Sequence, residues 1–152
     1  MDQAPGLTTR EILRQDFELN VTGPATLTDA LLPLLRKSAA PWVVFVSSSL
    51  SSIGMSCDKN SPWYNPGYEA KGYGCSKAAL NRLVGHYSRH LGDVGGLVNA
   101  VCPGLVATKL TGYPEGARAP EQGAKKIVEM VCWVKTARLR LLVMMMVLCL
   151  GG

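Results

Sequence analysis

Two short, largely apolar runs that contain several valines constrain the fold of this chain most strongly. The first, Trp42–Val46, reads WVVFV, and the second, Leu97–Cys102, reads LVNAVC. Runs of this kind are typical of strands that are covered on both faces in a parallel sheet. Segments with helical spacing of apolar residues precede, separate and follow them. The alternation predicts an α/β fold, with parallel strands joined by right-handed helical crossovers.

A sheet of only two parallel strands has little surface to bury and is rarely stable alone. We therefore interpret the pattern as part of a larger, doubly wound sheet. The chain has 152 residues, of which 47% are hydrophobic and 18% charged. These values fit a single globular domain and exclude a disordered or collagen-like chain.

Helix boundaries can be predicted from caps and breakers. The first helix should begin at Thr8 or Thr9, with Glu11 in its first turn, and Gly23-Pro24 should bend it. Residues 53–72 contain several glycines and prolines and are predicted to form a long loop. Further helices are expected over residues 73–90, which Gly92 should end, and from Pro120 to about residue 131.

Charge and cysteine content exclude several classes of protein. The net charge is +5 without a clustered basic segment, so we expect no nucleic-acid partner. The five cysteines form no CxxC pair or Cys/His cluster, which argues against a disulfide framework or a zinc site. The longest apolar run, Leu141–Leu150, is too short to span a bilayer, and no secretory signal is evident. We expect a reduced, cytoplasmic protein with no membrane partner.

Tyr73 and Lys77 are the first candidates for chemistry. They lie four residues apart on one predicted helix and so share a face. A nearby ammonium favours the phenolate and lowers the pKa of a tyrosine, which can then exchange a proton with a carbonyl or alcohol oxygen near neutral pH. The alternative is an exposed lysine beside a tyrosine that only packs.

Other polar residues follow the strands or interrupt a helix. Ser48 lies just past the first strand, at the end where open α/β sheets bind ligands. Asn20 precedes Gly23-Pro24, and a disrupted helix there would expose a backbone carbonyl. Pro103-Gly104 ends the second strand, and Thr108 follows. The alternative for Ser48 is a solvated serine turn, and for Asn20 it is a polar residue on a solvent-exposed helix face. For Pro103-Gly104 the alternative is an ordinary strand-to-loop turn.

In this order, the residues resemble the short-chain dehydrogenase/reductase family over about residues 8–131. The matching segments are LNVTG with Asn20, VVFVSS with Ser48, YGCSK with Tyr73 and Lys77, and VNAVCPGLVATKL, which contains Pro103, Gly104 and Thr108. The resemblance implies a Rossmann-like α/β fold and an active tetrad of Asn20, Ser48, Tyr73 and Lys77.

The family also implies an activity. Hydride would pass between NADP or NAD, with NADP slightly favoured, and a carbonyl or alcohol carbon of a small molecule. Tyr73 would be the general acid/base, Ser48 would hold the substrate oxygen, and Asn20 would keep a water that links Lys77 to solvent. Lys77 would lower the Tyr73 pKa and hold the nicotinamide ribose. Tyr73, Lys77, Pro103, Gly104 and Thr108 would thus bind the cofactor.

The sequence departs from this family at its start, in the long loop between Ser48 and Tyr73, and at its end. It lacks the Thr-Gly-x-x-x-Gly-x-Gly turn that binds the pyrophosphate. We therefore interpret residues 1–131 as a partial domain with impaired hydride transfer. The alternative is a non-catalytic oligomerisation module that pairs with a full-length relative, or with itself, through the helices carrying Asn20 and Tyr73. Residues 132–152 form an atypical basic and apolar tail, which we hypothesise is read in a shifted frame because another frame permits a Gly/Asp-rich end.

Two further features are ambiguous. His86 and His90 are four residues apart on a helix, but no third metal ligand is evident, so we expect no metal. Trp63, Tyr64 and Tyr68 lie between Ser48 and Tyr73. They could line a substrate pocket or simply pack on the domain.

Overall fold

The computed structural model describes residues 6–64 and 70–136. Its main elements are α1 (Thr9–Phe17), α2 (Gly23–Leu35), β1 (Trp42–Val46), α3 (Ile53–Cys57), α4 (Lys71–Leu91), β2 (Leu97–Val101) and α5 (Pro120–Thr136). The expected alternation of helices with two strands is confirmed, and α3 is an additional short helix. The tail from residue 137 onward, and Tyr68 within the loop, lie outside the described residues.

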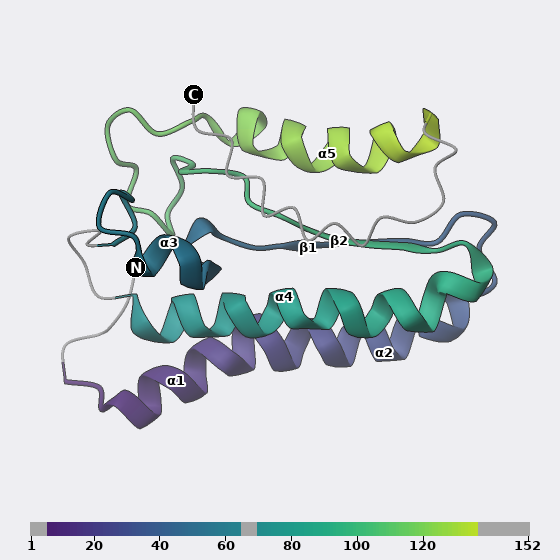
Figure 1. Cartoon of the computed structure of the whole chain (residues 1–152), viewed down its shortest axis with the longest axis horizontal. Helices are drawn as coiled ribbons and strands as arrows, with labels where there is room; N and C mark the ends of the chain where they lie inside the picture. Colours follow the sequence, from purple (N-terminus) through teal and green to yellow (C-terminus); the bar gives the residue numbers. More distant parts are fainter. Residues whose placement is uncertain (1–5, 65–69, 137–152) are drawn as a thin grey trace.

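The strands and helices form three layers (Figure 1). β1 and β2 pair in parallel, with Trp42 opposite Leu97 and Val46 opposite Val101. α4 contacts one face of this sheet and α1 and α2 lie alongside α4, while α5 contacts both strands from the other face. The predicted α/β architecture with a parallel sheet is thus confirmed. β1 was predicted with its exact bounds, and β2 ends one residue earlier than expected.

A π-helical turn, Glu18–Thr22, separates α1 from α2. Pro24 has no N–H, so it cannot donate the usual helical hydrogen bond to the carbonyl of Asn20, four residues earlier. The chain widens its turn at this point, and the N–H of Gly23 bonds to Glu18 instead. The predicted disruption at Asn20 is therefore present. Thr8 caps α1, and its hydroxyl and backbone form a reciprocal pair of bonds with Glu11.

The prediction of a loop over residues 53–72 is wrong at both ends. Ser52 caps the short helix α3, its hydroxyl accepting a bond from the N–H of Met55. α4 begins at Lys71, two residues before the expected start. A one-turn helix such as α3 shows no apolar periodicity, which is why the sequence pattern missed it. α5 also continues to Thr136, beyond the expected end.

The hydrophobic core lies between α4 and the two strands. Its buried members share this interface: Phe45, Leu80, Tyr87, Leu91 and Val98. The hydroxyl of Tyr87 lies 2.9 Å from both the Ala25 carbonyl and an Asp29 carboxylate oxygen, which ties α4 to α2. By contrast, Leu27, Leu31 and Leu34 of α2 are 61%, 41% and 64% exposed, so one flank of that helix contributes little to the core.

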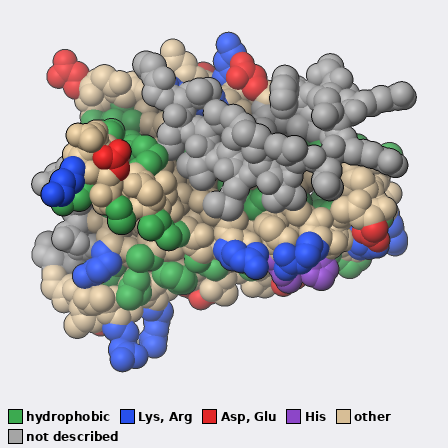
Figure 2. Space-filling model, in the orientation of Figure 1, with side chains coloured by type: hydrophobic (Ala, Val, Ile, Leu, Met, Phe, Trp, Pro, Cys, Tyr) green, Lys and Arg blue, Asp and Glu red, His purple; other side chains and the backbone are tan. Residues whose placement is uncertain are grey.

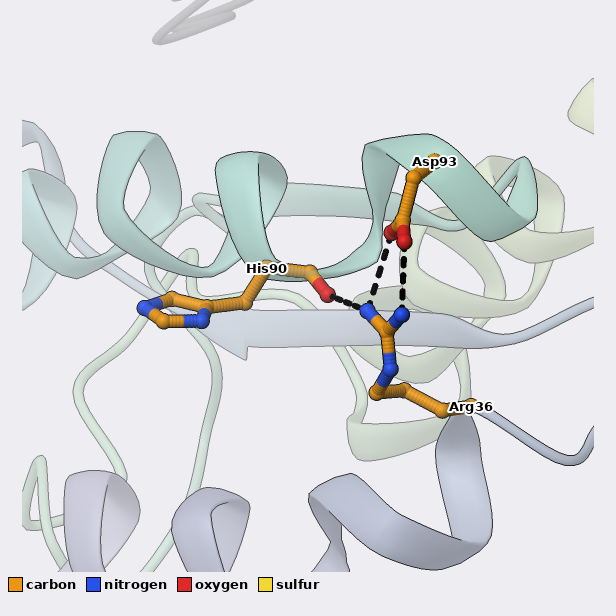
Figure 3. A network of polar contacts seen from close by, with 3 residues as sticks. All are labelled: Arg36, His90 and Asp93. Atoms are coloured by element: carbon orange, nitrogen blue, oxygen red, sulfur yellow. Dashed lines mark hydrogen bonds and ion pairs between the residues drawn. The ribbon is translucent and has the colours of Figure 1, made fainter.

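A polar network joins the segments that lead into β1 and β2, before the two strands begin (Figure 3). Arg36, which caps the end of α2, donates two hydrogen bonds to Asp93, at 2.9 and 2.6 Å, and one to the carbonyl of His90. The Arg36 guanidinium holds the pKa of the Asp93 carboxyl below its ordinary value. This fork joins α2 to the connection between α4 and β2.

The exterior shows no single charged region on the face in Figure 2, where Lys and Arg side chains lie scattered among apolar and acidic ones. Of the helices within residues 6–64 and 70–136, none is long and apolar enough to cross a membrane.

Candidate functional site

Tyr73 and Lys77 occupy successive turns near the start of α4. The Lys77 Nζ lies 5.5 Å from the centre of the Tyr73 ring, so the ammonium and the aromatic ring are neighbours. Both side chains are half-buried. A positive charge at this distance stabilises a phenolate more than a phenol. The predicted pairing of these two residues on one helix face is therefore present in the structure.

Lys77 also reaches the carboxyl end of β1. Its Nζ donates a 2.9 Å hydrogen bond to the carbonyl of Val46. Burial lowers the pKa of the Lys77 ammonium, because the charged form loses hydration that this carbonyl only partly replaces. Val46 is two residues before Ser48 in the sequence, so this bond holds the ammonium at the strand end from which Ser48 follows.

Ser48 stands in extended conformation, with φ −151° and ψ 153°, where β1 leaves the sheet. It caps the one-turn helix Ser49–Ser51, and its Oγ accepts a 3.3 Å hydrogen bond from the N–H of Leu50. The carbonyl of Ser48 accepts the hydroxyl of Ser51 at 2.6 Å. This serine turn contacts α4, the helix of Tyr73 and Lys77.

Asn20 is buried within the π-helical turn and points at α4 rather than at solvent. Its Nδ2 donates a 3.0 Å hydrogen bond to the Oγ of Ser76. That Oγ in turn donates to the backbone carbonyl of Tyr73 at 2.8 Å. Asn20 is thereby linked, through one serine, to the backbone of the candidate acid/base. The role of Asn20 as the holder of a water stays a prediction.

Pro103, Gly104 and Thr108 lie in the loop that follows β2. Because β1 and β2 are parallel and in register, this loop leaves the same edge of the sheet as the serine turn. The Oγ of Ser49 and the Sγ of Cys102 lie 3.4 Å apart and join the two strand ends. Gly104 has φ +81°, and a Cβ there would lie 3.2 Å from the Arg118 guanidinium, so glycine suits this turn.

The rest of this loop is held by its own threonines. The N–H of Thr108 donates to the Oγ of Thr111 at 3.0 Å, and that hydroxyl lies 2.6 Å from the carbonyl of Val106. A short parallel bridge between Val106 and Arg118 closes the loop. The backbone position of Thr108 is thus fixed by contacts that do not use a ligand.

Three buried polar residues near the tetrad escaped the sequence prediction: Ser51, Ser76 and Asn81. Asn81 lies four residues after Lys77 and eight after Tyr73, so it lies on the same side of α4. That spacing was the only available signal, and it cannot show that Asn81 faces Ser51. The imidazole rings of His86 and His90 contact each other, with centres 4.6 Å apart. In the described part of the chain, no three His, Cys, Asp or Glu side chains form a metal-binding group.

Known proteins resemble this chain over most of its length. A family model described as enoyl-(acyl carrier protein) reductase matches residues 3–147. A short-chain dehydrogenase of Penicillium roqueforti is 35% identical over 126 residues, which are 82% of this chain and 50% of the relative. The chain belongs to the short-chain dehydrogenase/reductase family. Another member, from Aspergillus aculeatus, is 37% identical over 116 residues, covering 76% of this chain and 41% of the relative.

Solved structures of the family share the fold. Salutaridine reductase from Papaver somniferum superposes with a TM-score of 0.64 at 26% identity, covering 82% of this chain and 52% of its own. An NADPH-bound carbonyl reductase from chicken fatty liver superposes with a TM-score of 0.63 at 26% identity. The match covers 78% of this chain and 46% of the reductase. The chain spans about half the length of the family members it matches.

Proposed function

We propose that this chain carries the acid–base half of an NADP- or NAD-dependent oxidoreductase that interconverts a carbonyl and an alcohol on a small molecule. The observation that supports this proposal is the Lys77 ammonium, half-buried, 5.5 Å from the Tyr73 ring and bonded to the last carbonyl of β1. Few structural roles require a desolvated lysine to face a tyrosine at the ligand-binding edge of an α/β sheet.

Each residue of the predicted tetrad has a task in this proposal. Tyr73 gives a proton to, or takes one from, the substrate oxygen, and Ser48 holds that oxygen by a hydrogen bond. Lys77 favours the phenolate of Tyr73, and Asn20 fixes the turn of α4 that contains Tyr73 through Ser76. The position of Ser48, just past β1, suits this assignment.

A nicotinamide cofactor fits one end of the site. Lys77 offers an ammonium for a ribose hydroxyl, and the turn at Gly104 brings backbone close to the same edge, where Pro103 and Thr108 would border the ring. The cofactor would supply or accept the hydride when bound. The sequence lacks a glycine-rich turn for the phosphates, so we expect weak binding and slow turnover in this chain. We favour NADP slightly over NAD, and a cytoplasmic site of action, since Cys57 and Cys75 are exposed free thiols.

The test is oxidation of NADPH and NADH by the purified chain with a panel of aldehydes and ketones. Tyr73→Phe should lower the rate by about 10²–10⁴-fold, the usual contribution of a general acid/base. Tyr113→Phe is the matched control, because Tyr113 is 66% exposed and its bond to the Thr108 carbonyl comes from the backbone N–H, which the substitution keeps. Equal rates in the parent chain and in Tyr73→Phe, or no oxidation in either, would contradict the proposal.

The second candidate function is an oligomerisation module. The exposed leucines of α2, on a helix beside α4, favour it, because exposed apolar stripes commonly mark interfaces. Size-exclusion chromatography with and without the full-length Penicillium roqueforti relative tests whether the chain is an oligomerisation module rather than an oxidoreductase. Co-elution that Leu27→Glu abolishes would support the module, whereas a monomer in both runs would exclude it.

A further inference from the structure

Two short hydrogen-bond relays of the same design flank the candidate tetrad. In the first, the Asn20 amide donates to Ser76, and Ser76 donates to the carbonyl of Tyr73, three residues before it. In the second, the Nδ2 of Asn81 donates to the Oγ of Ser51 at 2.7 Å, and Ser51 donates to the carbonyl of Ser48 at 2.6 Å. Each relay ends on the backbone of a candidate catalytic residue.

We propose that Asn81 and Ser51 are positioning residues that hold Ser48 at a fixed place relative to Tyr73 and Lys77. This proposal rests on the proposed function, since it names what sets the geometry of the same site. Asn81 lies on the helix of Tyr73 and Lys77, whereas Ser48 lies on the turn after β1. The relay is therefore a polar link between the two elements that must meet at one substrate oxygen.

Packing beneath the relay brings the same two elements into close contact. A Cβ on Gly74 would lie 3.0 Å from the carbonyl oxygen of Leu50, so the first turns of α4 rest against the backbone of the serine turn. Such an approach sets the separation of helix and turn, and the bond from Lys77 to the Val46 carbonyl ties α4 to the chain just before the turn. The hydrogen bond from Asn81 to Ser51 adds a directional restraint at the other end of the turn.

The burial of Asn81 argues that this amide does more than stabilise the fold. Asn81 and Ser51 are 8% and 7% exposed, and the Asn81 Oδ1 is buried without a hydrogen-bond partner among the described residues. A buried polar atom that lacks a partner costs free energy, and an apolar side chain of similar size would avoid that cost. The position thus gives up stability for a fixed geometry, as is common at functional sites.

The first test is amide hydrogen exchange in the purified chain, which requires no turnover. Asn81→Leu and Ser51→Ala should speed exchange at the N–H groups of Ser51 and Ser52, which bond to the Ser48 and Ser49 carbonyls. We expect an increase of about five- to tenfold, the factor that the loss of one hydrogen bond gives. The N–H of Ser47, bonded to Val101 in the sheet, should be unaffected.

Ser56→Ala is the matched control. Its hydroxyl also donates to a carbonyl three residues earlier, that of Ile53 at 2.8 Å, but it lies on exposed α3 outside the relay. Faster exchange in the two relay variants and not in this control supports the proposal. Unchanged exchange in the serine turn overturns it, whatever the activity. A midpoint of thermal unfolding for Asn81→Leu at or above that of the parent chain shows that the variant folds.

A coupled measurement separates positioning from general loosening. Ser51→Ala should lower kcat/KM about five- to tenfold when Ser48 is present and should have no further effect in Ser48→Ala. An equal decrease in both backgrounds contradicts action through Ser48. If the parent chain itself oxidises no NADPH or NADH, the proposed function fails, while the exchange experiment still decides whether the relay exists.

Discussion

The two halves of α4 differ in what they bury. The first half, from Tyr73 to Asn81, turns tyrosine, lysine and amide groups toward the end of β1. The second half, from Leu83 to Leu91, contributes Tyr87 and Leu91 to the apolar core against Phe45. Leu80, near the end of the first half, also belongs to this core. One helix thus supplies both chemistry and stability, and its apolar side chains hold its polar ones in place.

The polar half carries groups that cost stability. The Lys77 ammonium is partly desolvated, and the buried Asn81 Oδ1 lacks a hydrogen-bond partner among the described residues. The same is true of Ser47 Oγ, which lies outside α4, just after β1. Each loses hydration without full replacement. The comparison therefore predicts that substitutions of the core residues reduce stability most, whereas substitutions of the polar residues in the first half change the chemistry and leave stability intact.

Leu91→Ala should give the largest effect. Leu91 is fully buried in the core cluster, and truncating such a leucine removes contacts and leaves a cavity. We expect a loss of about 2–5 kcal/mol in the free energy of unfolding, measured with urea. Leu110→Ala, at a leucine that is 61% exposed, is the control and should change little. Similar losses in both variants would show that the second half of α4 is not the source of stability.

The second-largest effect should be seen when the free energy of unfolding is measured at alkaline pH in Tyr87→Phe. Burial, followed by its hydrogen bond to Asp29, raises the pKa of Tyr87 from 10.0 to about 12. The folded state therefore favours the neutral phenol, and this contribution is complete below pH 10 and is lost as pH rises from 10 to 12. In Tyr87→Phe, stability should depend less on pH in that window. An unchanged alkaline slope would contradict the assignment.

Lys77→Met should have a smaller effect on stability, and of the opposite sign. Burial lowers the pKa of folded Lys77 below the 10.5 of an ordinary lysine, so the folded state disfavours the charged form. The resulting cost is present at neutral pH and disappears as pH rises above the unfolded pKa. The midpoint of thermal unfolding at pH 7 should therefore equal or exceed that of the parent chain. The same variant should raise the pH at which the Tyr73 phenol ionises, followed by ultraviolet absorbance against Tyr73→Phe.

The stability and the phenol titration of Lys77→Met together test whether Lys77 serves the chemistry or the fold. Lower stability with an unchanged phenol titration would show that Lys77 is a structural residue. Lys71→Met is the matched control, since Lys71 is exposed on the first turn of the same helix and its Nζ donates to the hydroxyl of Thr9, at 3.4 Å, away from Tyr73. That variant should change neither measurement.

The sequence predicted those features that depend on local pattern. The bounds of β1 follow from an uninterrupted apolar run, and the disrupted helix at Asn20 follows from the missing N–H of Pro24. The contact between Tyr73 and Lys77 follows from helical spacing alone. The bond from Asn81 to Ser51 could not be predicted, because it joins residues thirty positions apart and depends on how α4 docks against the serine turn. The catalytic roles that the sequence assigns to the four residues of the tetrad stay predictions.

The smallest effect should come from the ion pair at the far end of α4. Arg36 and Asp93 make a two-pronged contact, but their side chains are 43% and 61% exposed. Exposed pairs are screened by water and salt and contribute little. In a double-mutant cycle of Arg36→Ala and Asp93→Asn, the coupling free energy should be smaller than the effect of Tyr87→Phe and should shrink in 1 M salt, where the screening length is about 3 Å.

Measuring stability at acid pH tests the contribution of the Arg36–Asp93 ion pair more directly. The guanidinium lowers the pKa of Asp93, so the stabilising contribution is present above the ordinary pKa of 3.8 and is lost as pH falls through the folded value. Arg36 also donates to the His90 carbonyl, a bond that does not titrate and that survives in Asp93→Asn. Arg36→Ala should therefore cost more than Asp93→Asn. A coupling as large as the Leu91→Ala effect would mean that the end of α4 is held by charge rather than by its apolar core.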